Sequence, residues 1–212
     1  MVKKLVMPTV GLFGSFFFCL LVNYVGILLI PAMLTAAGFT QAVASNALAA
    51  WNFGGVGGAI IGALIIQRLG SRITMLSMSA ISVVSALAMA AMPLDPQSTF
   101  RLVAMFVLLG GVLNAVQTTM YALAANVYPT EIRGTGIGTA VAVGRIGNVL
   151  ASYVGNFALD IDKGYKGGSP AYFSTFAVGM IIVFGSLALV RRHIAVTTIE
   201  ATAASVRAPA GH

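Results

Sequence analysis

Residues 5–67 of this chain read LVMPTVGLFGSFFFCLLVNYVGILLIPAMLTAAGFTQAVASNALAAWNFGGVGGAIIGALIIQ, and these 63 residues contain no Asp, Glu, Lys or Arg. A bilayer core about 30 Å thick is crossed by about 20 helical residues, since each residue adds 1.5 Å. The stretch is therefore long enough for two membrane crossings. The break at Gly38-Phe39-Thr40 predicts where the first crossing ends and the second begins.

The composition of the whole chain agrees with a membrane protein. Of its 212 residues, 58% are hydrophobic and 8% are charged, and the mean hydropathy is +0.96. Soluble domains carry about 25% charged residues, so this composition excludes most soluble enzymes and nucleic-acid-binding proteins. At 20–25 residues each, about six spans fit into this length and twelve do not.

The rest of the chain is divided by Gly, Pro or charged residues, as helix ends usually are. We predict an all-α integral membrane protein with one six-helix domain over residues 1–193 and a disordered cytoplasmic tail over 194–212. The predicted helices cover residues 8–37, 42–67, 73–92, 101–127, 134–159 and 171–190.

The placement of Lys and Arg predicts the orientation, because cytoplasmic loops are enriched in them. With the amino terminus inside, three basic residues lie outside: Arg101, Lys163 and Lys166. Eight lie on the cytoplasmic side: Lys3, Lys4, Arg68, Arg72, Arg133, Arg191, Arg192 and Arg207. Both termini are then cytoplasmic. This asymmetry explains the net charge of +7 without a nucleic-acid partner.

Arg145 is the remaining basic residue, and it falls inside the fifth predicted helix. An arginine at a helix centre costs about 2.5–3.5 kcal/mol on insertion scales, so it should face a cavity or a partner. Asn148, Ser152 and Asn156 follow at i+3, i+7 and i+11 on the same face. This stripe indicates a binding site for an anionic substrate, with the guanidinium gripping a carboxylate. The alternative is that Arg145 bonds carbonyl groups of a neighbouring helix.

A second polar stripe runs along the fourth predicted helix. Its members share one face and are Gly110, Asn114, Gln117 with Thr118, and Tyr121. Weaker candidates for ligand contact are Asn23 and Tyr24 on the first helix and Trp51 and Asn52 on the second. Such groups either orient a ligand in an apolar pocket or form hydrogen bonds between membrane helices.

Glycines at four-residue spacing form a third pattern. They are Gly54, Gly58 and Gly62 on the second helix, and Gly134 and Gly138 on the fifth. Small residues at i and i+4 allow two helix backbones to approach closely, so we expect these glycines to serve helix packing rather than ligand binding.

Several kinds of chemistry have no candidate in the sequence. Asp95, Glu131, Asp160, Asp162 and Glu200 all fall in predicted loops or the tail, which leaves no membrane carboxylate as a proton carrier. No metal-ligand cluster, Ser/His/Asp set or phosphate-binding loop is visible. We therefore expect neither an enzyme nor a bound cofactor or metal.

Three motifs carry a resemblance to a known family. They are Ala50-Trp51-Asn52-Phe53-Gly54-Gly55-Val56-Gly57-Gly58 leading to Arg68-Leu69-Gly70-Ser71-Arg72, Tyr121 to Gly136 with Pro129-Thr130-Glu131-Ile132-Arg133, and Gly144-Arg145-Ile146-Gly147. Over residues 16–190 the chain resembles the carboxy-terminal six-helix half of a major facilitator superfamily permease, most like the aromatic acid:proton symporters. Pro-Thr-Glu-x-Arg-x-x-Gly marks the superfamily broadly, whereas Gly-Arg-Ile-Gly points to the aromatic acid branch.

The resemblance implies a 3+3 inverted repeat and a substrate site near the midplane between two six-helix halves. It implies that the first and fourth helices line the cavity, and that Arg145 contacts substrate or takes part in coupling. It also implies cytoplasmic gating loops, which contain Arg68, Gly70, Arg72, Glu131 and Arg133. The implied partners are a small anionic aromatic substrate, protons, the lipid bilayer, and an absent amino-terminal half or a second six-helix chain.

The expected function is therefore half of a secondary transporter in the bacterial inner membrane, multi-pass, with aromatic carboxylate uptake coupled to protons and inactive without an amino-terminal half. Two alternatives stay open. One is a half-permease for sugars or other organic acids. The other is a truncated membrane protein that transports nothing.

Overall fold

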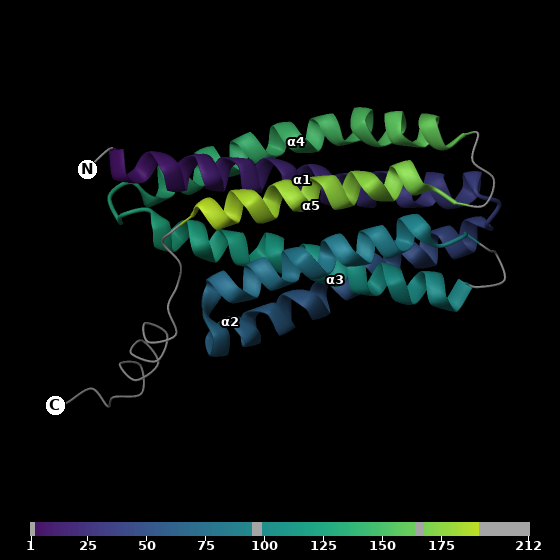
Figure 1. Ribbon diagram of the computed structural model, residues 1–212, viewed down its shortest axis with the longest axis horizontal. Helices are drawn as coiled ribbons and strands as arrows, with labels where there is room; N and C mark the ends of the chain where they lie inside the picture. Colours follow the sequence, from purple (N-terminus) through teal and green to yellow (C-terminus); the bar gives the residue numbers. More distant parts are fainter. Residues whose placement is uncertain (1–2, 95–98, 164–167, 191–212) are drawn as a thin grey trace.

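Five helices make up the described part of the chain, residues 3–94, 99–163 and 168–190, in the computed structural model (Figure 1). They are α1 (Lys3–Ala36), α2 (Gln41–Ala91), α3 (Thr99–Val127), α4 (Arg133–Asp162) and α5 (Pro170–Leu189). Each is long and apolar enough to cross a membrane. The predicted all-α class is confirmed for these residues, while the predicted tail lies outside them.

The second and third predicted helices form one element, α2, which explains why there are five helices instead of six. The backbone leaves the helical region at Gly70, with φ 76° and ψ 164°. Glycine adopts a positive φ readily because it has no Cβ. We call residues 41–69 the first limb and residues 71–91 the second limb. Figure 1 shows the two limbs side by side and running in opposite directions, so the reversal uses one residue where a loop over Arg68–Arg72 was expected.

The other helix ends lie at turn residues. Gly38 has a φ of 90° between α1 and α2, and the Thr40 hydroxyl accepts a hydrogen bond from the Val43 N–H at 3.4 Å to cap α2. Pro129 follows the end of α3, consistent with proline's restriction of the residue before it. Pro170 begins α5, where its missing N–H leaves no intrahelical bond unmade.

The helices pack as two pairs joined by α5. The two limbs of α2 pack mainly on α3, α1 packs mainly on α4, and α5 contacts α1, α2 and α4. In Figure 1, α4 lies along one edge of the bundle and α2 along the opposite edge. A fully buried aromatic group fills the space between the pairs and consists of Trp51, Phe106, Tyr172, Phe173 and Phe176.

Apart from Arg145, the charged residues of these helices lie toward the two ends of this bundle. The Tyr128 hydroxyl donates to Thr9 Oγ1 at 3.3 Å, which places the α3–α4 connection beside the start of α1. The Gly70 reversal lies toward the same end in Figure 1. Arg68, Arg72 and Arg133 therefore share one end of the bundle, and Lys163, at the end of α4, lies at the other.

Candidate functional site

Three side-chain amides from α1 and α3 meet inside the bundle. Asn23 is 2% exposed, and its Nδ2 donates to Asn114 Oδ1 at 3.3 Å and to Gln117 Oε1. Asn114 Nδ2 in turn donates to the Gly110 carbonyl at 2.9 Å. We call Asn23, Asn114 and Gln117 the amide cluster. It joins residues predicted separately on two helices, and it forms the interhelical hydrogen bonds that were the alternative to ligand binding.

Hydrogen-bonding capacity around this cluster is left unused. Asn23 Oδ1 and Trp51 Nε1 are buried and have no hydrogen-bond partner among the described residues. A buried polar atom without a partner costs about 1–3 kcal/mol, and most native ones are paired. Unpaired atoms in the middle of a bundle are therefore a signal for a bound water or ligand group.

Trp51 lies next to the amide cluster because two glycines make room for it. A Cβ on Gly26 of α1 would meet the indole at 2.8 Å, and one on Gly110 of α3 would lie 2.5 Å from the Trp51 carbonyl oxygen. Phe176 packs edge-on against the indole with ring centroids 5.8 Å apart. The indole thus bridges α1 and α3 about one helical turn from Asn23 and Asn114.

Arg145 lies on the outer face of α4. Gly144 and Gly147 on either side of it face α1, where a Cβ would overlap a Leu20 methyl group and the Phe17 carbonyl oxygen, respectively. Arg145 and Ile146 are exposed between them. The guanidinium has no hydrogen-bond or ion-pair partner within residues 3–94, 99–163 and 168–190, so the structure does not show the predicted alternative of bonds to helix carbonyls.

The remaining members of the α4 stripe differ in environment. Asn148 and Ser152 are half-buried, and Asn148 Oδ1 is a further buried atom with no partner in the described chain. Asn156 is exposed and lines a cavity near the end of the helix. The predicted stripe therefore spans two sites.

The other predicted ligand contacts on α1, α2 and α3, which are Tyr24, Asn52 and Tyr121, lie outside the amide cluster. Tyr24 is 37% exposed and Tyr121 is 38% exposed, and Tyr121 packs edge-on against Phe16 with ring centroids 5.1 Å apart. Asn52 is exposed, and its Nδ2 donates to the Leu48 carbonyl of its own helix at 2.8 Å. Asn52 does not join the amide cluster.

The residues assigned to gating loops are exposed at one end of the bundle, except for the buried Gly70. Arg133 Nε donates to the Tyr128 carbonyl at 3.4 Å, and Glu131 Oε1 accepts from Thr130 Oγ1 at 3.4 Å. Arg68, Arg72, Glu131 and Arg133 form no ion pair with a described residue. Their role as a gate stays a prediction.

The glycines predicted to serve helix packing have two kinds of surroundings. On α2, a Cβ on Gly54 or Gly58 would overlap the carbonyl oxygens of Val107 and Gly111, respectively, and one on Gly62 would lie 3.2 Å from the Ala115 Cβ. A Cβ on Gly134 or Gly138 would meet nothing within 4 Å. The expected packing role of these last two is therefore absent among the described residues, because the glycines that face α1 are Gly144, Gly147 and Gly155 instead.

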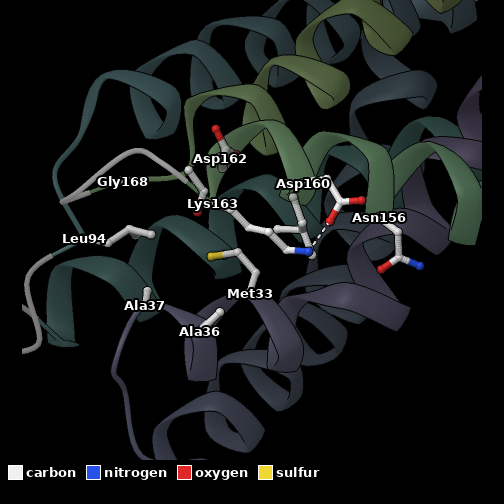
Figure 2. Close-up of a pocket in the computed structure, with 11 residues that line it drawn as sticks. Met33, Ala36, Ala37, Leu94, Asn156, Asp160, Asp162, Lys163 and Gly168 are labelled. Carbon is white, nitrogen blue, oxygen red and sulfur yellow. Dashed lines mark ion pairs between the residues drawn. The ribbon is translucent and has the colours of Figure 1, made fainter.

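A polar cavity of about 610 Å³ at the other end was not predicted (Figure 2). Asp160 and Asp162, expected in a loop, lie in the last turn of α4. Asp160 pairs with Lys163 at 2.5 Å. Asp162 is 9% exposed, and it accepts the N–H groups of Ala171 and Tyr172, each at 2.9 Å. This carboxylate caps α5 from eight residues before its first residue, a spacing that no local capping rule identifies.

Comparison with known proteins agrees with this architecture. A family model described as Major Facilitator Superfamily matches residues 11–209. The chain is 32% identical over 178 residues to a 3-(3-hydroxy-phenyl)propionate transporter of Escherichia coli, covering 83% of this chain and 43% of the relative. It is 27% identical to a gallate transporter of Pseudomonas putida, with 80% and 38% covered, and 27% identical to a gentisate transporter of Corynebacterium glutamicum, with 72% and 35% covered.

The chain thus spans about two-fifths of the length of the curated relatives it matches. The family model covers nearly all of the chain, and the relatives are aromatic acid transporters. The chain therefore belongs to the major facilitator superfamily and is similar to its aromatic acid permeases.

Proposed function

We propose that this chain is the carboxy-terminal half of a secondary transporter that takes up aromatic carboxylates with protons by alternating access. The observation that carries the proposal is a buried amide cluster in the middle of an apolar bundle, with Arg145, which pairs with no described residue, at a neighbouring level. Polar groups held inside membrane helices usually mark a substrate path. The guanidinium supplies the charge for a carboxylate, and the amides supply neutral hydrogen bonds.

The level of Arg145 follows from its neighbours. Gly144 faces Phe16 and Leu20, and Gly147 faces Phe17 and Leu21. Tyr121 contacts Phe16 from α3. A substrate bound by Arg145 therefore lies at the height of these residues, about one helical turn from Asn23.

The helix lengths support six crossings in a 3+3 arrangement. Each limb of α2 exceeds the roughly 20 residues that a crossing needs, so the Gly70 reversal divides α2 into two spans. The gathering of Arg68, Arg72 and Arg133 at one end supports a cytoplasmic location for that end and for both termini, in the bacterial inner membrane.

The outer face of α4 supports an amino-terminal half, or a second six-helix chain, as the partner. Of the most apolar stretch of α4, 22% is buried in the bundle, against 61% for α1. The exposed side chains beyond Arg145 are large and include Val149, Tyr153 and Phe157. The relatives are more than twice as long as the aligned chain, which is consistent with such a half. We expect no transport without it.

The proposal is tested with the chain in lipid nanodiscs and, for uptake, co-reconstituted with an amino-terminal half of the Escherichia coli relative. We expect saturable binding of 3-phenylpropionate and uptake that follows an imposed proton gradient. Arg145→Leu should abolish binding, and Arg145→Lys should weaken it strongly because the planar fork is lost. Arg101→Leu, an exposed arginine at the other end, is the matched control.

The alternatives give different results. Binding of sugars, unaffected by Arg145→Leu, would replace the proposed substrate class. A folded chain that binds neither class, with or without the partner half, would indicate a protein that transports nothing.

A further inference from the structure

The amide cluster has one position that no described side chain fills. Asn23 uses its Nδ2 for both Asn114 and Gln117, which leaves its Oδ1 buried and unpaired in the described chain. Both neighbours present oxygen atoms to Asn23, so the cluster holds three amide oxygens close together. A group placed there has to donate a hydrogen bond to Oδ1, and an amide or hydroxyl hydrogen satisfies this need.

The need for a hydrogen-bond donor at Asn23 Oδ1 distinguishes between the carboxylate and the hydroxyl group of an aromatic acid. A carboxylate is an acceptor only and cannot pair with Asn23 Oδ1, whereas a phenolic hydroxyl donates one hydrogen bond and accepts others. The amide cluster therefore suits a hydroxyl and not the carboxylate. The cation needed for the carboxylate is Arg145, on a different helix.

The two positions differ by about one helical turn in height along the bundle. The contacts of Gly144 and Gly147 place Arg145 near residue 19 of α1 in height, about four residues from Asn23, or roughly 6 Å along the axis. Gln117 and Asn114 are half-buried whereas Asn23 is buried, so a ligand reaches the cluster from the side of these two residues on α3.

We propose that the amide cluster recognises a hydroxyl group on the aromatic ring of the substrate, with Asn23 accepting the hydroxyl proton and Gln117 donating to the hydroxyl oxygen. This inference rests on the proposed function and adds the ring substituent to it. Asn23 and Gln117 are then the specificity residues for hydroxylated over unsubstituted aromatic acids. A site built to pair a hydroxyl discriminates against the analogue that lacks it, because the buried atom is left without a partner.

The test compares two probes that differ by one hydroxyl, 3-(3-hydroxyphenyl)propionate and 3-phenylpropionate, by calorimetric titration of the chain in nanodiscs with and without the partner half. We expect the hydroxylated acid to bind about tenfold more tightly, which corresponds to the hydrogen bond gained. Asn23→Leu and Gln117→Leu should each reduce this ratio to about one, whatever their effect on the affinity for 3-phenylpropionate itself. Asn46→Leu, at an exposed position of α2, should keep the ratio.

Each outcome decides between the two proposals. A ratio near one in the unsubstituted chain, with Arg145-dependent binding of both acids, overturns the hydroxyl site and leaves the transporter proposal standing; a water then satisfies Asn23. Binding of neither acid overturns both. Where Asn23→Leu fails to fold, Gln117→Leu decides, because its side chain is half-buried and a leucine of similar size replaces it.

Discussion

Two pairs of glycines in this chain have the same four-residue spacing and opposite surroundings. Gly54 and Gly58 press the first limb of α2 against α3, so closely that no Cβ fits at either position. Gly134 and Gly138 near the start of α4 have open space where a Cβ would be. The difference lies in the partner helix, because Gly110 and Gly111 on α3 leave backbone exposed for α2 to approach. Glycines at four-residue spacing allow a second helix to pack closely against that face. Whether close packing occurs depends on the residues of the second helix.

Gly58→Ala tests the close contact between α2 and α3, and it is expected to have the largest effect on stability. The new methyl group would overlap the carbonyl oxygen of Gly111, which is backbone and cannot rotate away. We expect the free energy of unfolding to fall by about 3 kcal/mol or more, the range of severe overpacking. Thermal unfolding in mixed micelles, followed by circular dichroism, measures it.

Gly57→Ala is the matched control, because a Cβ at Gly57 meets nothing within 4 Å. Alanine is also the better helix former by about 1 kcal/mol, so the control should be neutral or slightly stabilising. Equal stability of the two variants would show that α2 and α3 are not in close contact in the folded chain.

A second substitution tests whether α4 packs closely against α1 through its own glycines. Gly147→Ala would place a methyl group on the Phe17 carbonyl oxygen of α1, and we expect a loss of about 1–3 kcal/mol in the free energy of unfolding. Gly138→Ala on the same helix should cost nothing. If both variants unfold at the temperature of the unsubstituted chain, the α1–α4 contact is looser than the structure has it.

Asp162→Ala probes the end of α4 that the sequence placed in a loop. It removes the acceptor of two N–H groups at the start of α5, and we expect a loss of about 1–2 kcal/mol, the worth of a good helix cap. Asp160→Ala removes only an exposed ion pair with Lys163, which is worth about 0–1 kcal/mol. Hydrogen exchange of the first turn of α5 should rise in the first variant alone; exchange unchanged in both would contradict the cap.

The smallest expected effect on stability is that of Arg145→Leu. The side chain is exposed and pairs with no described residue, so its removal breaks no contact. Because an arginine is unfavourable at the centre of a membrane helix, we expect no loss in the free energy of unfolding. The same variant should lose substrate binding, and this separation of effects distinguishes the outer face of α4 from its glycine face. A stability loss above about 1 kcal/mol would reveal a structural partner for the guanidinium.

The sequence predicted the helical class correctly, and the rotation of individual helices about their axes poorly. Asn23, Asn114 and Gln117 were identifiable because a polar side chain is rare in an apolar stretch. The contact between these three side chains could not be predicted, because it depends on the rotation of α1 and α3 about their own axes. In a soluble protein the polar face of a helix gives that rotation, whereas here lipid and bundle interior are equally apolar.

The same reason explains the errors on α4. Its glycines were assigned by spacing at Gly134 and Gly138, while the helix turns Gly144 and Gly147 toward α1. Asp162 was placed in a loop because a carboxylate is unfavourable in a membrane. Its partners, the N–H groups of Ala171 and Tyr172, belong to the next helix and leave no local pattern. The reversal at Gly70 was expected as a five-residue break because Arg68 and Arg72 suggested one.

The abruptness of the Gly70 reversal has a consequence for how the chain is made. With one non-helical residue between the limbs, the ends of the two limbs at Gly70 cannot move apart once both are helical. We expect the two limbs to leave the translocation machinery together as a preformed hairpin. In the proposed orientation, Arg68 and Arg72 at its tip stay on the cytoplasmic side.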